Sequence, residues 1–138
     1  MQSYEALSRF LVRLDLDEEI ITTLSQFAKE KQLKGAQVFG IGAVKQAVLG
    51  FFDLSRREYQ KQEFSEEMEL VSLMGNLSWS GEEPILHAHV SISGPDYRVF
   101  GGHLFSAFIA VTGEFFITPL DIKIERMLHE PTGLKLIH

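Results

Sequence analysis

The chain has 138 residues, a length that suits one domain, and it contains no cysteine, which excludes disulfides and thiolate chemistry. Its 13 basic and 19 acidic residues give a formal net charge of −6, which opposes binding to a polyanion such as DNA. The sequence has no apolar run long enough to span a membrane and no apolar signal-peptide block near its start. We therefore expect a single cytoplasmic domain over residues 1–138, with no membrane partner.

The N-terminal part predicts a strand followed by the main helix. Residues 6–14 alternate between apolar and polar side chains, as in a half-buried strand. Asp17 is placed to cap a helix over about residues 18–34, in which apolar residues recur at helical spacing. Gly35 follows as the residue expected to end this helix.

Short apolar segments separated by turn residues predict strands for the rest of the chain. A turn is expected around Gly94-Pro95-Asp96. Strands joined by short turns, with one main helix, indicate an α+β domain with a mostly antiparallel central sheet. The predicted strands are residues 36–41, 44–54, 69–79, 85–93, 98–105, 107–111, 114–118 and, as the last long strand, 122–128.

Two histidines lie two residues apart in the predicted strand 85–93. Because side chains alternate across a sheet, Leu86 and Ala88 would face the core while His87 and His89 share the other face. Imidazoles placed in this way can converge on one metal ion through their ring nitrogens. The pair therefore predicts two ligands of a divalent metal.

A third histidine, His103, belongs to the next predicted strand. A turn centred on one residue, such as Asp96, would place His103 opposite His89 and on the same face. A turn of two or four residues would place it on the other face, unless a bulge at Gly101-Gly102 restored it. Three histidine ligands leave a coordination position open for water or another ligand, as in catalytic zinc sites.

The three histidines also have a structural interpretation, in which they form a polar cluster that hydrogen-bonds Ser91 or a neighbouring subunit. Glu114 is a weak candidate for a catalytic general base or a carboxylate that supports the site, although a turn or an ion pair also accounts for it. His129 and His138 have no such neighbours in the sequence, and we interpret both as surface residues. No motif for an organic cofactor is found.

Five short motifs carry a resemblance that covers about residues 4–128. They are GIGAV at 40–44, LMGNLS at 73–78, HAHV at 87–90, GGHL at 101–104 and TGE at 112–114. Together they resemble the plants-and-prokaryotes-conserved (PPC) domain family, and GGHL with HAHV upstream is the most specific element. In plant members this domain is joined to an AT-hook, the segment that binds DNA, while the domain itself mediates assembly.

The resemblance implies an α+β fold, a homotrimer and a metal site, expected to hold zinc, on His87, His89 and His103. This chain departs from the plant pattern because it has no AT-hook and no basic tail. A trimer would carry three times −6, or −18, so direct DNA binding is doubtful here.

Three functions remain open, and binding or regulation is preferred because no second catalytic group stands out. The chain would be a trimeric binding or regulatory module whose ligand is a small molecule or a partner protein. The alternatives are a zinc-dependent enzyme acting on a small substrate and, more weakly, a DNA-binding protein. Aromatic residues suit subunit interfaces, and the candidates here are Phe51, Phe52, Phe115 and Phe116.

Overall fold

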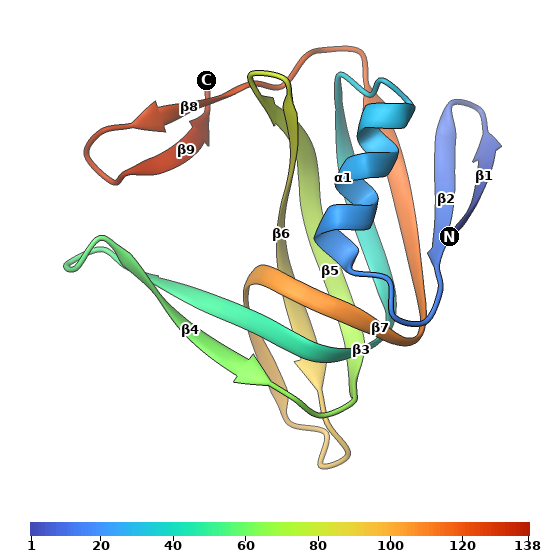
Figure 1. Cartoon of the computed structure of the whole chain (residues 1–138), viewed down its shortest axis with the longest axis vertical. Coiled ribbons are helices and arrows are strands. Elements are labelled where there is room, and N and C mark those ends of the chain that lie inside the picture. The colour runs from blue at the N-terminus through green and yellow to red at the C-terminus, as the bar shows by residue number, and fades with distance from the viewer.

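The computed structural model describes residues 1–138, apart from the side chain of Ala6. It is an α+β domain, as predicted, in which a helix covers one face of an antiparallel sheet (Figure 1). No helix in the described chain is long and apolar enough to cross a membrane. The elements are β1 (Gln2–Ala6), β2 (Arg9–Leu14), α1 (Ile20–Glu30), β3 (Gly35–Asp53), β4 (Glu58–Phe64), β5 (Met68–Ser80), β6 (Glu83–Ser93), β7 (Val99–Leu120), β8 (Arg126–His129) and β9 (Leu134–Ile137).

The seven-stranded sheet has the order β1-β2-β7-β6-β5-β3-β4, with an additional pairing of β7 to β3. The two longest strands, β3 and β7, bend because each pairs with different neighbours along its length. The predicted interruption at Gly42 is therefore wrong: β3 continues through it, and only its register shifts there. The three predicted strands from 98 to 118 are likewise one strand, β7.

The helix differs from its prediction at both ends. Its N-cap is Glu19, whose carboxylate accepts hydrogen bonds from the backbone N–H groups of Ile21 and Thr22. Asp17 instead has a left-handed φ of 68° and forms an ion pair with Lys45. The helix ends at Glu30, four residues before the predicted end.

Gly35 begins β3 and does not cap the helix. A Cβ atom there would lie 2.6 Å from Cγ1 of Ile124, so close packing requires glycine at this position. The residue with left-handed backbone after the helix is Gln32, whose φ is 52°.

The two ends of the chain form hairpins that the sequence interpretation missed. The strand predicted for 6–14 begins at Arg9, because Leu7 and Ser8 both have left-handed φ values and turn the chain back onto β1. Residues 122–128 do not form the last long strand. Only Arg126–His129 is extended, and it pairs with β9 in a separate two-stranded sheet.

Strand β4 was not predicted. Its sequence, EYQKQEF, is mostly polar, and most of its side chains are exposed. It pairs only with β3 at the edge of the sheet, where a strand needs no apolar alternation to be stable.

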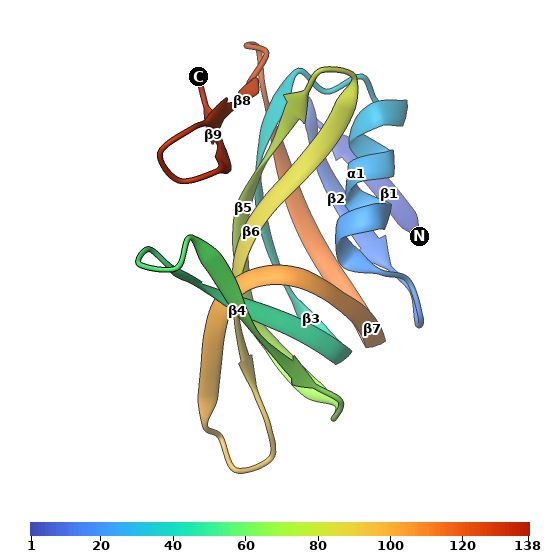
Figure 2. The same cartoon turned by 60° about the vertical axis from the view of Figure 1, so that its left-hand side comes forward.

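The two faces of the sheet differ sharply in burial. Helix α1 packs on one face, and side chains there such as Val12 and Phe115 are 0% exposed. The opposite face leaves Phe39, Met74 and Phe116 exposed at 43%, 61% and 50%. Figure 2 shows α1 and the β8–β9 hairpin on opposite sides of β5 and β6, so the hairpin lies on the side that the helix leaves uncovered.

Candidate metal site

The predicted register between the two histidine strands is confirmed. Ser93 pairs with Val99, so the connecting loop is centred on Asp96, and His89 lies directly opposite His103. Residues 86, 88, 90 and 92 of β6 are all buried in the core, as the alternation predicted. The histidines therefore share the face of the sheet that the helix does not cover.

The three imidazole rings form a compact triangle. Their centroids are 5.4 Å apart for His87 and His89, 5.2 Å for His87 and His103, and 5.6 Å for His89 and His103. One ring nitrogen from each residue lies within 4.8 Å of the others. Small rotations of the rings would let nitrogens this close converge on a shared ion, for which the usual zinc–nitrogen distance is about 2.0–2.1 Å.

Glycine allows a close strand crossing beside this triangle. A Cβ atom at Gly102 would lie 2.9 Å from the carbonyl oxygen of Gly50, which faces His103 across the β3–β7 ladder. The GGHL motif thus brings β3 against β7 where His103 projects. Tyr59 of β4 stacks on the His103 ring at 5.0 Å between centroids, and Phe105 packs against it at 4.9 Å.

The surroundings favour the neutral form of His87 and His103. Burial, followed by the positive charges of His87, His89, Arg126 and Lys61, lowers the pKa of His103 to about 4. Burial is also the main cause that lowers the pKa of His87. Because a metal binds the neutral imidazole, these environments suit ligation at neutral pH.

One ring nitrogen in the cluster supports a bound cation directly. Among the described residues, Nδ1 of His103 is buried and has no hydrogen-bond partner. A buried polar atom without a partner costs free energy, and a metal ion would satisfy such a nitrogen. The residues present therefore fit a metal that prefers imidazole ligands.

Arg126 is the one charged side chain buried beside the histidines. Its guanidinium donates to Oγ of Ser78 at 2.7 Å, to Oδ1 of Asn76 at 2.9 Å and to the carbonyl oxygen of Lys135 at 3.0 Å. It also lies 3.1 Å from Nδ1 of His87. Since arginine has only donors, Nδ1 of His87 accepts this hydrogen bond.

This contact has a consequence for metal binding by His87. When Nδ1 accepts a hydrogen bond from Arg126, the neutral ring carries its own proton on Nε2. Ligation of a metal through Nε2 would move that proton to Nδ1, where it would face an N–H group of Arg126. The contact between Arg126 and His87 must therefore loosen when His87 binds a metal.

Other predicted site residues lie elsewhere. Glu114 is exposed in the second half of β7, opposite Arg13 and Ile41, whereas His103 lies in the first half opposite His89. Within one chain, Glu114 therefore lies apart from the histidine cluster.

Of the four candidate interface residues, Phe115 is fully buried beneath α1, which corrects its assignment. Phe51 and Phe116 are exposed at 69% and 50%, and Phe52 is half-buried. His129 and His138 are exposed, as expected of surface residues.

Sequence reasoning missed Arg126 and Tyr59. Arg126 was assigned to a long terminal strand, and no motif distinguishes a buried arginine from a surface one. Tyr59 belongs to β4, whose polar sequence gave no strand signal.

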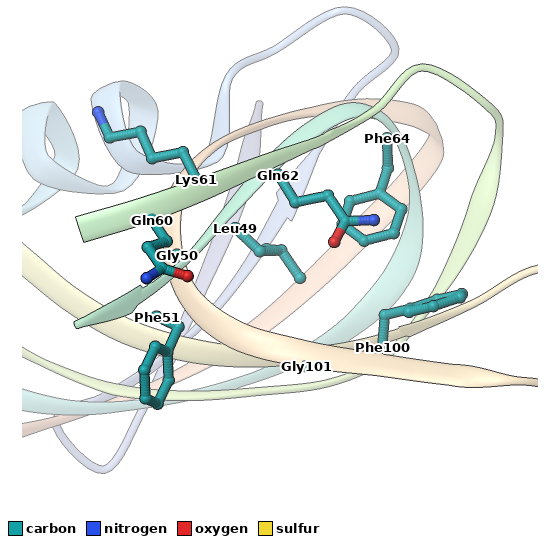
Figure 3. A pocket seen from close by; sticks show the side chains of 9 residues that line it. All are labelled: Leu49, Gly50, Phe51, Gln60, Lys61, Gln62, Phe64, Phe100 and Gly101. Atoms are coloured by element: carbon teal, nitrogen blue, oxygen red, sulfur yellow. The ribbon is translucent and has the colours of Figure 1, made fainter. Parts of the chain in front are cut away.

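A cavity of about 280 Å³ lies between β3, β4 and the start of β7, away from the histidines (Figure 3). Figure 3 shows the side chains of Gln60 and Gln62 on the cavity side of β4, while Lys61 points the other way. Nζ of Lys61 lies 3.9 Å from the ring centre of Phe105, which packs on His103. The cavity and the histidine cluster are thus on different sides of β4.

The fold and the histidine cluster define a class: a small α+β domain with a candidate three-histidine metal site on the open face of its sheet. Residues 1–121 match the Plants and Prokaryotes Conserved (PCC) domain. The chain belongs to this family, the one named PPC above. No protein of curated function matches it.

Solved structures support the same assignment. A candidate DNA-binding protein from Bacteroides thetaiotaomicron is 31% identical, with a TM-score of 0.95 over 99% of this chain and 96% of that one. A PPC protein from Pyrococcus horikoshii is 33% identical, with a TM-score of 0.88 over 99% and 93%. A metal-containing protein from Archaeoglobus fulgidus is 38% identical, with a TM-score of 0.87 over 98% and 96%.

Proposed function

We propose that this protein is a self-assembling PPC module that holds a divalent metal, zinc in the first instance, on His87, His89 and His103. The observation that carries the proposal is the convergence of three ring nitrogens within 4.8 Å. The orphaned Nδ1 of His103 supports it. The 38% identical protein described as metal-containing adds support from outside this chain.

Zinc is the metal that this ligand set favours among the common candidates. Neutral imidazoles suit zinc and its transition-metal neighbours, whereas magnesium and calcium require oxygen ligands. Three nitrogens leave a fourth position free, at which a bound zinc would polarise a ligand or lower the pKa of water. The module would therefore bind a small ligand through its metal.

Metal content tests this function. Protein purified without an affinity tag and without added metal should contain about one zinc per chain by mass spectrometry. His89→Ala should lose it while keeping its circular dichroism spectrum, because His89 is exposed and supports no core packing. His129→Ala, an exposed histidine on the terminal hairpin, is the matched control and should keep the metal. Equal metal in wild type and His89→Ala would refute the site.

Assembly into a homotrimer is the second part of the proposal. Directly paired residues of neighbouring strands form what we call the exposed row: Leu11, Phe116, Phe39, Met74, His89 and His103. The row is largely apolar and runs into the metal site. A contiguous apolar surface of this kind is typical of an interface. We propose that further copies of this chain cover it.

Sedimentation at micromolar concentration tests the trimer. The expected mass is three times 15.6 kDa, or 46.8 kDa. Phe39→Glu should shift it toward the monomer, because a buried carboxylate in the row would have no partner. Leu54→Glu, which changes an exposed leucine in the turn after β3, should leave the trimer intact. A monomeric wild type would contradict this part of the proposal.

Binding is preferred over catalysis and over DNA recognition. No carboxylate lines the cavity beside the histidines to serve as a general base. The Bacteroides protein is described as a candidate DNA-binding protein, but a net charge of −6 per chain opposes binding to phosphates. A gel shift at low salt should show no complex with duplex DNA, and a retarded band would restore the DNA-binding alternative.

A further inference from the structure

The guanidinium of Arg126 is a buried charge without a counter-ion. Its side chain is only 9% exposed, and its four acceptors are a hydroxyl, an amide, a carbonyl and an imidazole, all neutral. None of the ion pairs in the described chain includes it. Buried charges in proteins are normally paired, and a bound anion would complete the environment of Arg126.

The guanidinium lines a cavity that it shares with the metal site. The cavity has a volume of about 240 Å³, and His87, His103 and Arg126 line it. Leu134 and Leu136 of β9 line it as well. Four of the five N–H donors of Arg126 are used by the contacts above, so one N–H on Nη1 remains for a ligand.

The electrostatics of this cavity select the charge of its ligand. The charged side chains at this cavity are all positive: Arg126 and Lys135 line it, and Lys61 lies near His103. No acidic residue lines the cavity. A divalent metal would add to this positive potential, which then favours an anion at the open coordination position.

The lining of the cavity indicates the chemistry of the uncharged part of the ligand. Ile85, Leu134 and Leu136 make much of the lining apolar, and Tyr59 adds an aromatic ring. A volume of 240 Å³ is below the range of about 300–1,000 Å³ usual for drug-sized ligands. A small molecule with one anionic end and a short apolar chain fits these walls better than a fully hydrated phosphate ion does.

We propose that this cavity binds a short-chain carboxylate, with its carboxylate between the bound metal and Arg126 and its apolar chain against the β8–β9 hairpin. This proposal rests on the metal site of the proposed function and names the class of ligand that this site takes. Arg126 acts as a specificity-determining residue, and it lies beyond residues 1–121 that match the family domain.

Calorimetry on the cobalt-loaded full-length protein tests the proposal, with the cobalt absorption spectrum as a second readout. Butyrate should bind and shift the spectrum, at least tenfold more tightly than inorganic phosphate. Arg126→Met should weaken butyrate binding about tenfold or more, since it removes a charge-assisted contact. The same variant should bind cobalt equally well or more tightly, because a positive charge and the hydrogen bond that competes for His87 are both lost.

A second variant pair guards against misfolding of Arg126→Met. Leu136→Glu puts a negative charge on the cavity wall, whereas Ile137→Glu changes the next residue of β9, which does not line the cavity. Both residues are exposed, at 41% and 55%, so both variants should fold. Leu136→Glu should weaken butyrate about tenfold and Ile137→Glu should not.

The outcomes separate the two proposals. Cobalt bound without any butyrate response, tighter binding of phosphate than of butyrate, or equal butyrate affinity in wild type and Leu136→Glu would each overturn the carboxylate site alone. Absence of cobalt from the wild-type protein would overturn the metal site and the carboxylate site together.

Discussion

Phe115 and Phe116 are neighbours in β7, yet they belong to two different environments. Phe115 points beneath α1 and is 0% exposed, while Phe116 lies on the open face and is 50% exposed. The covered face is closed by the helix within one chain. The open face carries an apolar row that ends in histidines, and the β8–β9 hairpin lies on that side, next to His87 and His103.

The contrast between the two faces of the sheet indicates which face stabilises this domain and which face binds. Burial of apolar area drives folding, so the covered face should account for most of the stability of a single chain. The open face retains exposed apolar and metal-binding groups that contribute to stability only when something binds to them.

Removal of the Phe115 ring should have the largest effect. Phe115→Ala should lower the free energy of unfolding by about 3–5 kcal/mol, as expected when a buried aromatic ring leaves a cavity. Denaturant titration measures this, with Phe116→Ala as the matched control. The loss in Phe116→Ala should be smaller and should depend on protein concentration, because it acts through assembly. Equal, concentration-independent losses would contradict the contrast between the faces.

Metal should stabilise the open face by a smaller amount. Zinc at about one hundred times its dissociation constant should add about 2.7 kcal/mol to the free energy of unfolding. Thermal denaturation with and without a chelator measures the gain. His103→Ala should abolish it, since it removes one of the three ligands, whereas His138→Ala should keep it. Stabilisation of His103→Ala by zinc would point to binding elsewhere.

The cap of helix α1 should contribute less to the free energy of unfolding than the Phe115 ring or bound zinc. Glu19 accepts from two helix N–H groups and also from the backbone N–H of Ala107 at 3.2 Å, which ties α1 to β7. Glu19→Ala should therefore cost about 1–2 kcal/mol, the upper part of the range for helix caps. Asp17 was the predicted N-cap but does not cap the helix. Asp17→Asn should therefore change the free energy of unfolding by less than about 0.5 kcal/mol.

The smallest effect is expected just after the helix. Gln32 has a left-handed φ of 52°, which glycine adopts without the Cβ clash. Gln32→Gly should be neutral or raise the free energy of unfolding by up to about 1 kcal/mol, despite the greater freedom of glycine in the unfolded chain. Gln26→Gly, within the same helix, should instead be destabilising by denaturant titration, because glycine is a poor helix residue.

Much of the fold could be predicted from the local sequence pattern. Where those predictions were wrong, the cause is a local irregularity of the strand. Residues 85–93 alternate cleanly, and β6 follows that alternation. Val71 shows the opposite case: regular alternation would place it on the same face as the buried Leu73 and Leu77, but a register shift between Leu70 and Ser72 leaves it 49% exposed. A bulge of this kind has no signature in a single sequence.

The extra strand breaks predicted in β3 and β7 have a related cause. Gly42 and Gly113 read as turn residues, but they face each other in the β3–β7 ladder, where two bent strands cross closely. Glycine marks both a turn and a close approach of two strands, and only the partner strand distinguishes them.

The sequence predicted that His89 lies opposite His103 for one of the turns that it left open, the turn centred on a single residue such as Asp96. Strand alternation has a period of two, and a loop centred on Asp96 leaves one register for the two strands. It did not determine that His87 meets His103, because His87 pairs with Asn76, and β7 leaves β6 beyond His103 to follow β3. Bending of the long strands brings those two rings together.

Only the tertiary structure decided what surrounds the histidines. Arg126 lies 48 residues from Ser78 and 39 from His87 in the sequence, and the terminal hairpin brings its guanidinium to both. The choice between Phe115 and Phe116 likewise depended on which face the helix covers. Local spacing sets which residues share a face, whereas long-range packing sets which face is buried and which charges lie beside it.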